Sequence, residues 1–210
     1  MKVIAAVGDY YHDQKLFKEA LLSVTKGILN LEIEFVAREQ LAAHLKEVPG
    51  IVILGSENRL NPEEENVEFW LTKSEEAEIT EYVKKGGSWL AWHSGMASYE
   101  DNASFIDMLG GYFMHHPDDH VNVRYEYAED HGLSKAKDSF EITDEHYFIN
   151  NDKDVSVFLT STSEHGDSVA AWTKSYGDGK VCCYVPAHNE EGLMHASVQS
   201  DLKHILKWLS

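Results

Sequence analysis

The segment with the clearest chemical signal is residues 86–99, GGSWLAWHSGMASY. A hydrophobic strand here runs directly into His93, Ser94 and Gly95, and small residues follow. This order is typical of a nucleophile elbow, a tight strand-to-helix turn that holds one side chain above the carboxyl ends of the strands. Because ligands bind at those strand ends, the position predicts that His93 belongs to a functional site. The alternative is a strand-end histidine that is hydrogen-bonded in the core.

Two neighbours of His93 are candidates for contact with a substrate. A serine nucleophile needs a base that faces its hydroxyl and a third group that orients the base. Adjacent residues on an elbow point apart, so we assign Ser94 to substrate binding rather than to nucleophilic attack. Core packing explains most tryptophans in apolar segments. Trp92 borders the elbow, however, and we keep it as a substrate-binding candidate.

The elements that must position these residues alternate along the first half of the chain. Apolar runs predict strands at residues 2–7, 31–36, 49–55 and 88–93. Helical periodicity predicts helices at 16–24, ending before Gly27, at 37–46 and at 75–85. Ser74 is the expected N-cap of the last helix, without a capping box because residue 77 is alanine. This alternation implies an open, mostly parallel sheet with helices on both faces.

The second half of the chain has a different pattern. Short alternating runs predict antiparallel strands and one final core strand at 121–127, 139–143, 155–160, 168–173 and 180–185. A helical register from Val198 to Leu209 predicts a terminal helix that packs back on the sheet. No repeat or linker interrupts the 210 residues, so we expect a single domain over 1–210.

Three further segments resemble the signatures of a known family. They are GGYFMHHP at 110–117, DEHY at 144–147, and 171–192, in which Ala187 stands where a glycine usually precedes the final histidine. With the elbow, these segments make the chain similar to the ThuA-like family (trehalose utilisation type) of the class I glutamine amidotransferase-like superfamily. The resemblance implies an α/β three-layer sandwich with a mostly parallel, flavodoxin-like sheet. Extra antiparallel strands are expected in the C-terminal half.

The resemblance also has a consequence for the elbow. When the amidotransferase pattern G-x-C-x-G is placed on residues 91–95, His93 occupies the position of the nucleophilic cysteine. The only cysteines, Cys182 and Cys183, are adjacent in a predicted strand far along the chain. We therefore do not expect an active glutamine amidotransferase. Neighbouring strand side chains point to opposite faces, so these two cysteines cannot form a normal bridge, in agreement with a reducing compartment.

The matches imply a site in which distant residues meet. The candidate metal ligands are His93, His116, Glu145 and His188. Imidazoles with one carboxylate suit zinc or another borderline divalent ion, and His93 and Glu145 are also the candidate catalytic residues. The candidate substrate-binding residues are His12, Trp92, Ser94 and Tyr147. No tight spacing such as H-E-x-x-H is present, so a hydrogen-bonded polar pocket without metal stays open. No nucleotide cofactor is expected.

The composition excludes several classes of partner. The 36 acidic and 18 basic side chains give a formal net charge of -18, which repels nucleic acid and anionic lipid surfaces. No apolar run approaches the roughly 20 residues that span a bilayer. The N-terminal MKVIAAVGDYYHD reaches Gly and Asp too early for a signal peptide. We therefore expect a cytoplasmic protein that binds neither nucleic acid nor membrane.

The expected function follows from the family resemblance. It implies carbohydrate utilisation, with trehalose, a related disaccharide or a keto derivative as the substrate class. We favour a hydrolytic or isomerising enzyme, metal-dependent if an ion is bound. The alternative is a non-catalytic sugar-binding or regulatory domain on the same scaffold, since a fold does not determine a function. A homodimer is the base-rate expectation for the assembly.

Overall fold

The computed structural model describes residues 1–210 except 27, 29, 130–132 and 134–137. Its central sheet begins with five parallel strands in the order β2-β1-β3-β4-β11. These strands are β1 (Lys2–Val7), β2 (Glu32–Phe35), β3 (Ile51–Gly55), β4 (Ser88–Trp92) and β11 (Gly179–Tyr184). Every residue of β3 and β4 is buried, as expected for continuous apolar runs covered on both faces.

Four antiparallel strands extend the same sheet beyond β11, in the order β10-β9-β6-β7. They are β6 (Val121–Tyr127), β7 (Phe140–Asp144), β9 (Ser156–Ser163) and β10 (Gly166–Tyr176). A separate antiparallel pair joins β5 (Gly111–His115) to β8 (Phe148–Asn151). Buried and exposed side chains alternate along β6 and β7, so one face of this half packs on the core.

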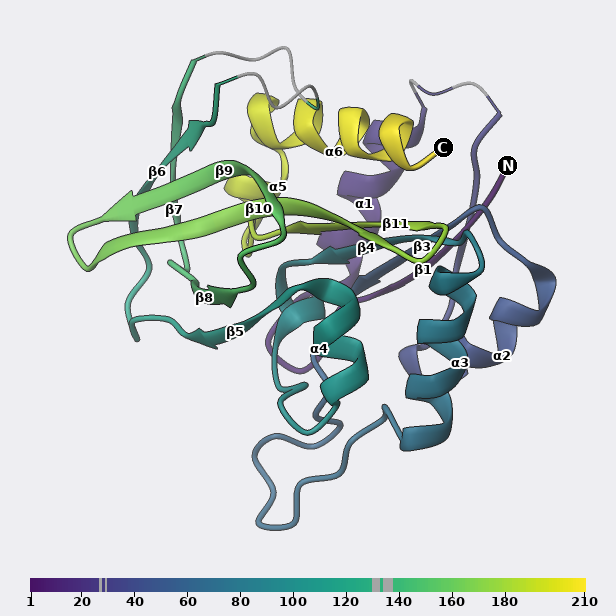
Figure 1. The fold of residues 1–210 in the computed structure, drawn as a ribbon. Helices are drawn as coiled ribbons and strands as arrows, with labels where there is room; N and C mark the ends of the chain where they lie inside the picture. The colour runs from purple at the N-terminus through teal and green to yellow at the C-terminus, as the bar shows by residue number, and fades with distance from the viewer. Residues whose placement is uncertain (27, 29, 130–132, 134–137) are drawn as a thin grey trace.

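Helices cover the sheet on both sides, which makes three layers (Figure 1). One layer contains α1 (Gln14–Thr25), α5 (Glu190–Leu193) and α6 (Ala196–Leu209). The other contains α2 (Leu41–His44), α3 (Lys73–Lys84) and α4 (Ala103–Leu109). The predicted α/β sandwich is therefore confirmed, with parallel strands in the N-terminal half and antiparallel strands added later.

Two local predictions about helices are wrong. The helix expected at 37–46 is a 3₁₀ turn, the single α-turn α2 and a second 3₁₀ turn. The N-cap of α3 is Thr72 rather than Ser74, and a capping box is present because Thr72 and Glu75 bond reciprocally. The box satisfies two backbone N–H groups that a start at Ser74 would leave open. Gly27, the predicted stop of α1, lies outside the described residues.

Both cysteines of β11 are buried, although their side chains point to opposite faces, because each face of this strand is covered. Burial raises the pKa of the Cys182 and Cys183 thiols. Neither thiol is therefore poised as a nucleophile. Among the described residues, no helix combines the length and the apolar character needed to cross a bilayer.

Candidate metal and active site

The strand β4 ends in a tight turn at His93. The φ angle of His93 is 48°, and the chain enters a 3₁₀ turn over His93–Met96. Gly95 is required at this turn, because a Cβ atom there would lie 2.0 Å from the carbonyl oxygen of Leu54. This left-handed residue at a strand-to-helix junction is the elbow that the sequence predicts.

Four side chains meet beside the elbow: His12, His93, Glu145 and His188. They follow β1, β4, β7 and β11 along the chain. Each offers one atom that could bind a metal, and these four atoms all lie within 4.8 Å of one another. Glu145 Oε2 is 3.3 Å from His93 Nε2, 3.2 Å from His188 Nδ1 and 4.0 Å from His12 Nε2. A tetrahedral zinc with bonds of about 2.0–2.2 Å separates its ligand atoms by roughly 3.3–3.6 Å. Two of these spacings match that geometry and the third is slightly longer.

The imidazole of His12 is oriented by Asp9. His12 Nδ1 donates to Asp9 Oδ1 at 2.5 Å, since a carboxylate oxygen only accepts. The neutral ring then has its lone pair on Nε2, which is buried and has no hydrogen-bond partner. A carboxylate that fixes the tautomer of a ligating histidine is the usual outer contact of a metal site. Burial raises the pKa of Asp9, but the hydrogen bond from His12 and its neighbours outweigh it and bring the pKa to about 2.

A backbone carbonyl orients His93 in the same way. His93 Nδ1 donates to the carbonyl oxygen of Val185 at 2.7 Å. Burial lowers the pKa of His93 to about 4, although Glu145 opposes this shift. At neutral pH the ring is therefore uncharged and directs the lone pair of Nε2 toward the carboxylate of Glu145. Two acceptors facing each other need a cation between them.

The charges of Glu145 and His188 depend on each other. Burial raises the pKa of Glu145, but contacts with His188 and His93 hold it well below its usual value. Burial lowers the pKa of His188, whereas Glu145 raises it above the ordinary value. A proton shared by this pair therefore favours His188 over Glu145. A divalent ion bound by these groups would displace that proton.

Asp144 positions two members of this group through the backbone. Its Oδ1 accepts hydrogen bonds from the amide N–H of Glu145 at 3.0 Å and of His188 at 2.9 Å. Asp144 is completely buried, and burial raises its pKa to about 7 although both N–H bonds oppose the shift. One carboxylate thus ties the loop after β7 to the loop after β11.

The ThuA family, described as trehalose utilisation, matches residues 3–209. This chain belongs to the ThuA family. No curated protein matches it in sequence.

Solved structures agree with the ThuA fold. A ThuA-like protein from Bacteroides uniformis superposes with a TM-score of 0.76 at 18% identity, covering 100% of this chain and 91% of the other. A cytoplasmic protein from Salmonella typhimurium LT2 gives 0.71 at 13% identity, covering 100% of both chains. A β-galactosidase from Rahnella sp. R3 gives 0.67 at 10% identity, covering 99% of this chain and 31% of that enzyme. At these identities the likeness concerns the fold alone, which resembles glutamine amidotransferase-like domains.

The structure explains the ThuA signature D-E-x-Y in physical terms. Asp144 anchors the loop and Glu145 stands at the centre of the histidines. The ring of Tyr147 stacks on His93, with ring centroids 4.3 Å apart. Tyr147 also lines a pocket of about 300 Å³ in front of the four-residue group, together with His12, Glu145, His116 and Phe113.

His116 lies at the rim of the group rather than inside it. Its Nε2 is 3.8 Å from Glu145 Oε1, and its Nδ1 donates to the carbonyl oxygen of Pro117. His12 takes the place expected for His116, because the loop after β1 brings its ring against His93 and His188, with ring centroids 4.9 and 4.8 Å away. His120 lies at the same rim, with its Nε2 3.9 Å from Glu145 Oε1.

Two expected substrate contacts are instead buried supports of the site. Trp92 has no exposed surface, because its indole packs on Phe17 and donates to the carbonyl oxygen of Pro186. Ser94 is also completely buried, and its hydroxyl donates to Asp9 Oδ2 at 2.8 Å. Neither side chain reaches the pocket, since the elbow directs them into the core.

Sequence reasoning missed several residues that shape the site. Asp9 orients the ring of His12, and Asp144 accepts hydrogen bonds from the backbone of Glu145 and His188. Glu57 and Arg59 line the pocket from the loop after β3. Asp9 carried a usable signal, because it follows an apolar strand directly. The roles of Glu57 and Arg59 had no such signal, because their loop reads as an ordinary acidic connection.

Proposed function

We propose that this chain is a metal-dependent enzyme of carbohydrate utilisation that acts on a trehalose-like disaccharide or a keto-sugar derivative in the cytoplasm. The observation that supports it most is the buried Nε2 of His12, which lacks a hydrogen-bond partner and lies 4.0 Å from Glu145 Oε2. Buried polar atoms are normally paired, so an orphaned lone pair beside a carboxylate fits a cation ligand.

Four residues would hold the ion: His12, His93, Glu145 and His188. When bound, a divalent metal such as zinc polarises a sugar carbonyl or hydroxyl. His93 has no exposed surface, so its part is to hold the ion and not to touch the sugar. His12 contributes to both the ion site and the pocket wall.

The two oxygens of Glu145 face different partners, and the partners at the pocket rim are suited to move a proton. Oε2 faces the buried rings of His93 and His188. Oε1 faces His116 and His120 at 3.8 and 3.9 Å, and the side chains of these two histidines are 33% and 43% exposed. A proton taken from a sugar hydroxyl or from a carbon beside a carbonyl would pass to a rim histidine rather than to Glu145, because His188 and His93 hold the pKa of Glu145 well below its usual value.

The test combines metal analysis with turnover. Protein purified with zinc should contain one ion per chain and convert trehalose or its keto derivative, followed by NMR of the sugar. His93→Ala and Glu145→Ala should lose both the ion and turnover. His165→Ala, an exposed histidine in the hairpin between β9 and β10, should retain both. A chain that binds the sugar equally well without metal, and never converts it, would instead be a sugar-binding module.

A further inference from the structure

The loop between β3 and α3 carries a buried carboxylate that the proposed chemistry does not use. Glu57 is 2% exposed. Its Oε2 accepts from Arg59 Nε at 2.7 Å and from Ser98 Oγ at 3.1 Å. Its Oε1 is buried and has no hydrogen-bond partner. A buried carboxylate oxygen without a donor is costly, so its retention calls for a group that supplies one.

Glu57 belongs to the wall of the pocket in front of Glu145. Glu57 and Arg59 line the pocket with His12 and Glu145, so the loop pair and the four-residue ion site share one cavity. The cavity of about 300 Å³ is at the lower end of the range for small-molecule sites, roughly 300–1,000 Å³. It therefore suits one sugar ring better than an entire disaccharide.

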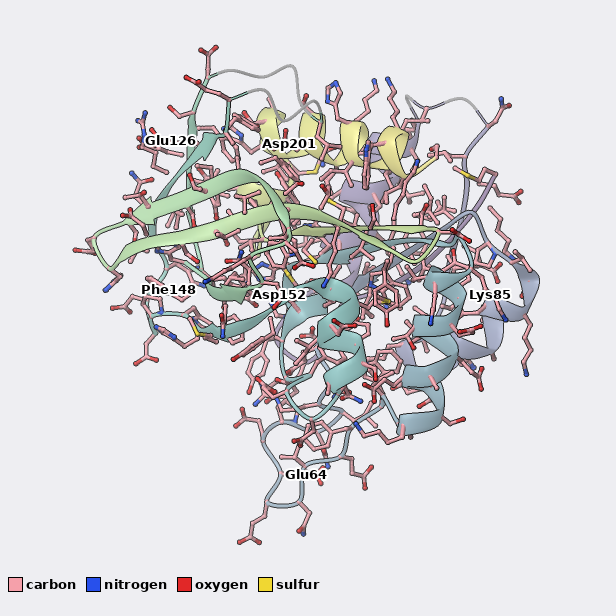
Figure 2. The ribbon with its side chains drawn as sticks, viewed as in Figure 1. Glu64, Lys85, Glu126, Phe148, Asp152 and Asp201 are labelled. Carbon is pink, nitrogen blue, oxygen red and sulfur yellow. The ribbon has the colours of Figure 1, made fainter. Side chains whose placement is uncertain are left out.

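The base of the loop is held rigidly, although its middle extends away from the body below α4, where Glu64 is labelled (Figure 2). Arg38 donates to the carbonyl oxygen of Glu57 at 2.9 Å. The amide N–H of Glu57 donates to Asp9 Oδ2 at 2.9 Å, and Asp9 also orients His12. The carboxylate of Glu57 is thus fixed relative to the ion site before any ligand arrives, which reduces the cost of binding.

We propose that Glu57 and Arg59 form a recognition subsite for adjacent hydroxyls of one neutral sugar ring, whose other side faces Glu145. This inference rests on the proposed function and names its substrate class more closely. Glu57 Oε1 accepts from one hydroxyl, and the Nη groups of Arg59 donate to its neighbour. The Arg59 guanidinium lies 5.8 Å from the centroid of the Tyr11 ring, which supports it at the pocket mouth.

The arrangement disfavours an acidic sugar. The positive charge of Arg59 is already paired with Glu57 at 2.7 Å. The atom left without a partner is a carboxylate oxygen, which accepts a hydroxyl proton but repels a second carboxylate at hydrogen-bond distance. A uronate would therefore meet like charge at the position where a neutral ring meets an acceptor.

The test measures binding of D-glucose and D-glucuronate to the zinc-loaded full chain by saturation-transfer NMR. Trehalose consists of two glucose units, so glucose supplies the single neutral ring. We expect glucose to bind at least 10-fold more tightly than glucuronate. Glu57→Gln, which presents an amide N–H to the ligand, should weaken glucose binding by about 10- to 100-fold. Glu64→Gln, the same change at an exposed position of the same loop, should have no effect.

Arg59→Met provides a second variant, which removes the donors for the neighbouring hydroxyl. It also leaves the buried Glu57 without its cationic partner, so its unfolding midpoint is measured on the same samples. The subsite is disproved by glucose affinity unchanged in Glu57→Gln and Arg59→Met, by glucuronate binding as tightly as glucose, or by no binding of either sugar. Zinc content, measured on the same samples, separates the two proposals. Glucose binding that depends on Glu57 in a chain that takes no zinc would retain the subsite and refute the metal.

Discussion

Among the residues that the structure describes, two groups of side chains bring possible metal-ligand atoms within 4.8 Å of one another. One is the buried group of His12, His93, Glu145 and His188, and the other is a surface group in which the half-buried His44 lies between the exposed Glu34 and Glu47. In the surface group, Lys2 Nζ lies 2.8 Å from Glu34 and also contacts Glu47, and both carboxylates are more than 40% exposed. His44 Nδ1 is hydrogen-bonded to Glu47 at 2.9 Å. A lysine and water thus already satisfy this cluster.

The difference between the two groups shows that proximity of donors does not make a metal site. In the buried group the ion pairs of Glu145 in the described part of the chain are all with histidines, and the Nε2 of His12 has neither a hydrogen-bond partner there nor exposure to water. What distinguishes it is the orientation of two imidazoles. Asp9 and a backbone carbonyl bind Nδ1 of His12 and of His93, so that the Nε2 atom of each ring faces Glu145. The following four experiments test this distinction, from the largest expected effect to the smallest.

Zinc should stabilise the folded chain through the buried group alone. At free zinc 1,000-fold above its dissociation constant, binding adds about 4 kcal/mol to the free energy of unfolding. For a chain of this size the melting temperature should rise by roughly 10 °C, measured by differential scanning calorimetry. Glu145→Ala should abolish the rise. An unchanged rise in Glu145→Ala would place the ion elsewhere.

Because His93 is buried and neutral, its titration should destabilise the metal-free chain in mild acid, while Asp144, whose pKa burial raises to about 7, acts in the opposite direction. The His93 pKa of about 4 in the fold lies below the unfolded value of about 6.5, so the unfolded state binds more protons at this residue between these pH values. This contribution is therefore intact above pH 6.5 and is lost as pH falls toward 4, by about 3 kcal/mol. Urea unfolding at pH 7 and pH 4 measures it.

The matched variant for that experiment is His93→Asn, because asparagine tolerates the left-handed backbone of position 93 and does not titrate. Its unfolding free energy should fall less between pH 7 and pH 4 than that of the parent chain. Equal pH dependence in the two proteins would contradict a buried neutral imidazole at the elbow.

Asp9→Asn should weaken zinc binding without abolishing it. The amide no longer favours the His12 tautomer that presents Nε2, and loss of such an outer contact costs about 10- to 100-fold in metal affinity. Competition with a fluorescent zinc chelator gives the dissociation constant. Ser94→Ala, which removes only one of the other donors to Asp9, should have a smaller effect. The reverse order would argue against the role of Asp9.

The smallest effect is expected at the surface group. His44→Ala should leave the zinc content at one ion per chain and change the unfolding free energy by less than about 0.5 kcal/mol, because its partner is exposed and solvent-screened. Metal analysis and urea unfolding check both quantities. Loss of the ion in His44→Ala would reverse the assignment of the two groups.

The sequence predicts the parallel half of the fold well because its strands are continuous apolar runs. The antiparallel strands β6, β7, β9 and β10 were also expected from their alternation. The sequence patterns do not predict α4, β5 or β8, because α4 has fewer than two full turns and the short β5 and β8 show neither a long apolar run nor an alternation. The capping box of α3 is hard to recognise in the sequence, because Ser74 is a second possible N-cap two residues after Thr72.

The convergence of distant side chains is best predicted where a side chain directly follows a strand. His93 and Glu145 immediately follow β4 and β7, and both lie in the buried group. The exchange of His116 for His12 could not be predicted, because it depends on how the loops after β1 and β5 approach the elbow. The sequence indicates the turn at the elbow but not the direction of its side chains. Trp92 and Ser94 were therefore expected to contact the substrate, whereas both point into the core.

The four prospective ligands come from the exits of β1, β4, β7 and β11, which span most of the chain. A nascent chain that has formed only β1 to β4 has His12 and His93 of this group, but it lacks Glu145 and His188. All four side chains could bind one ion only after β11 has paired with β4 and the antiparallel strands that include β7 have joined the sheet. Metal binding would then link the N-terminal and C-terminal parts of the protein, and it would occur only in chains that have completed the fold.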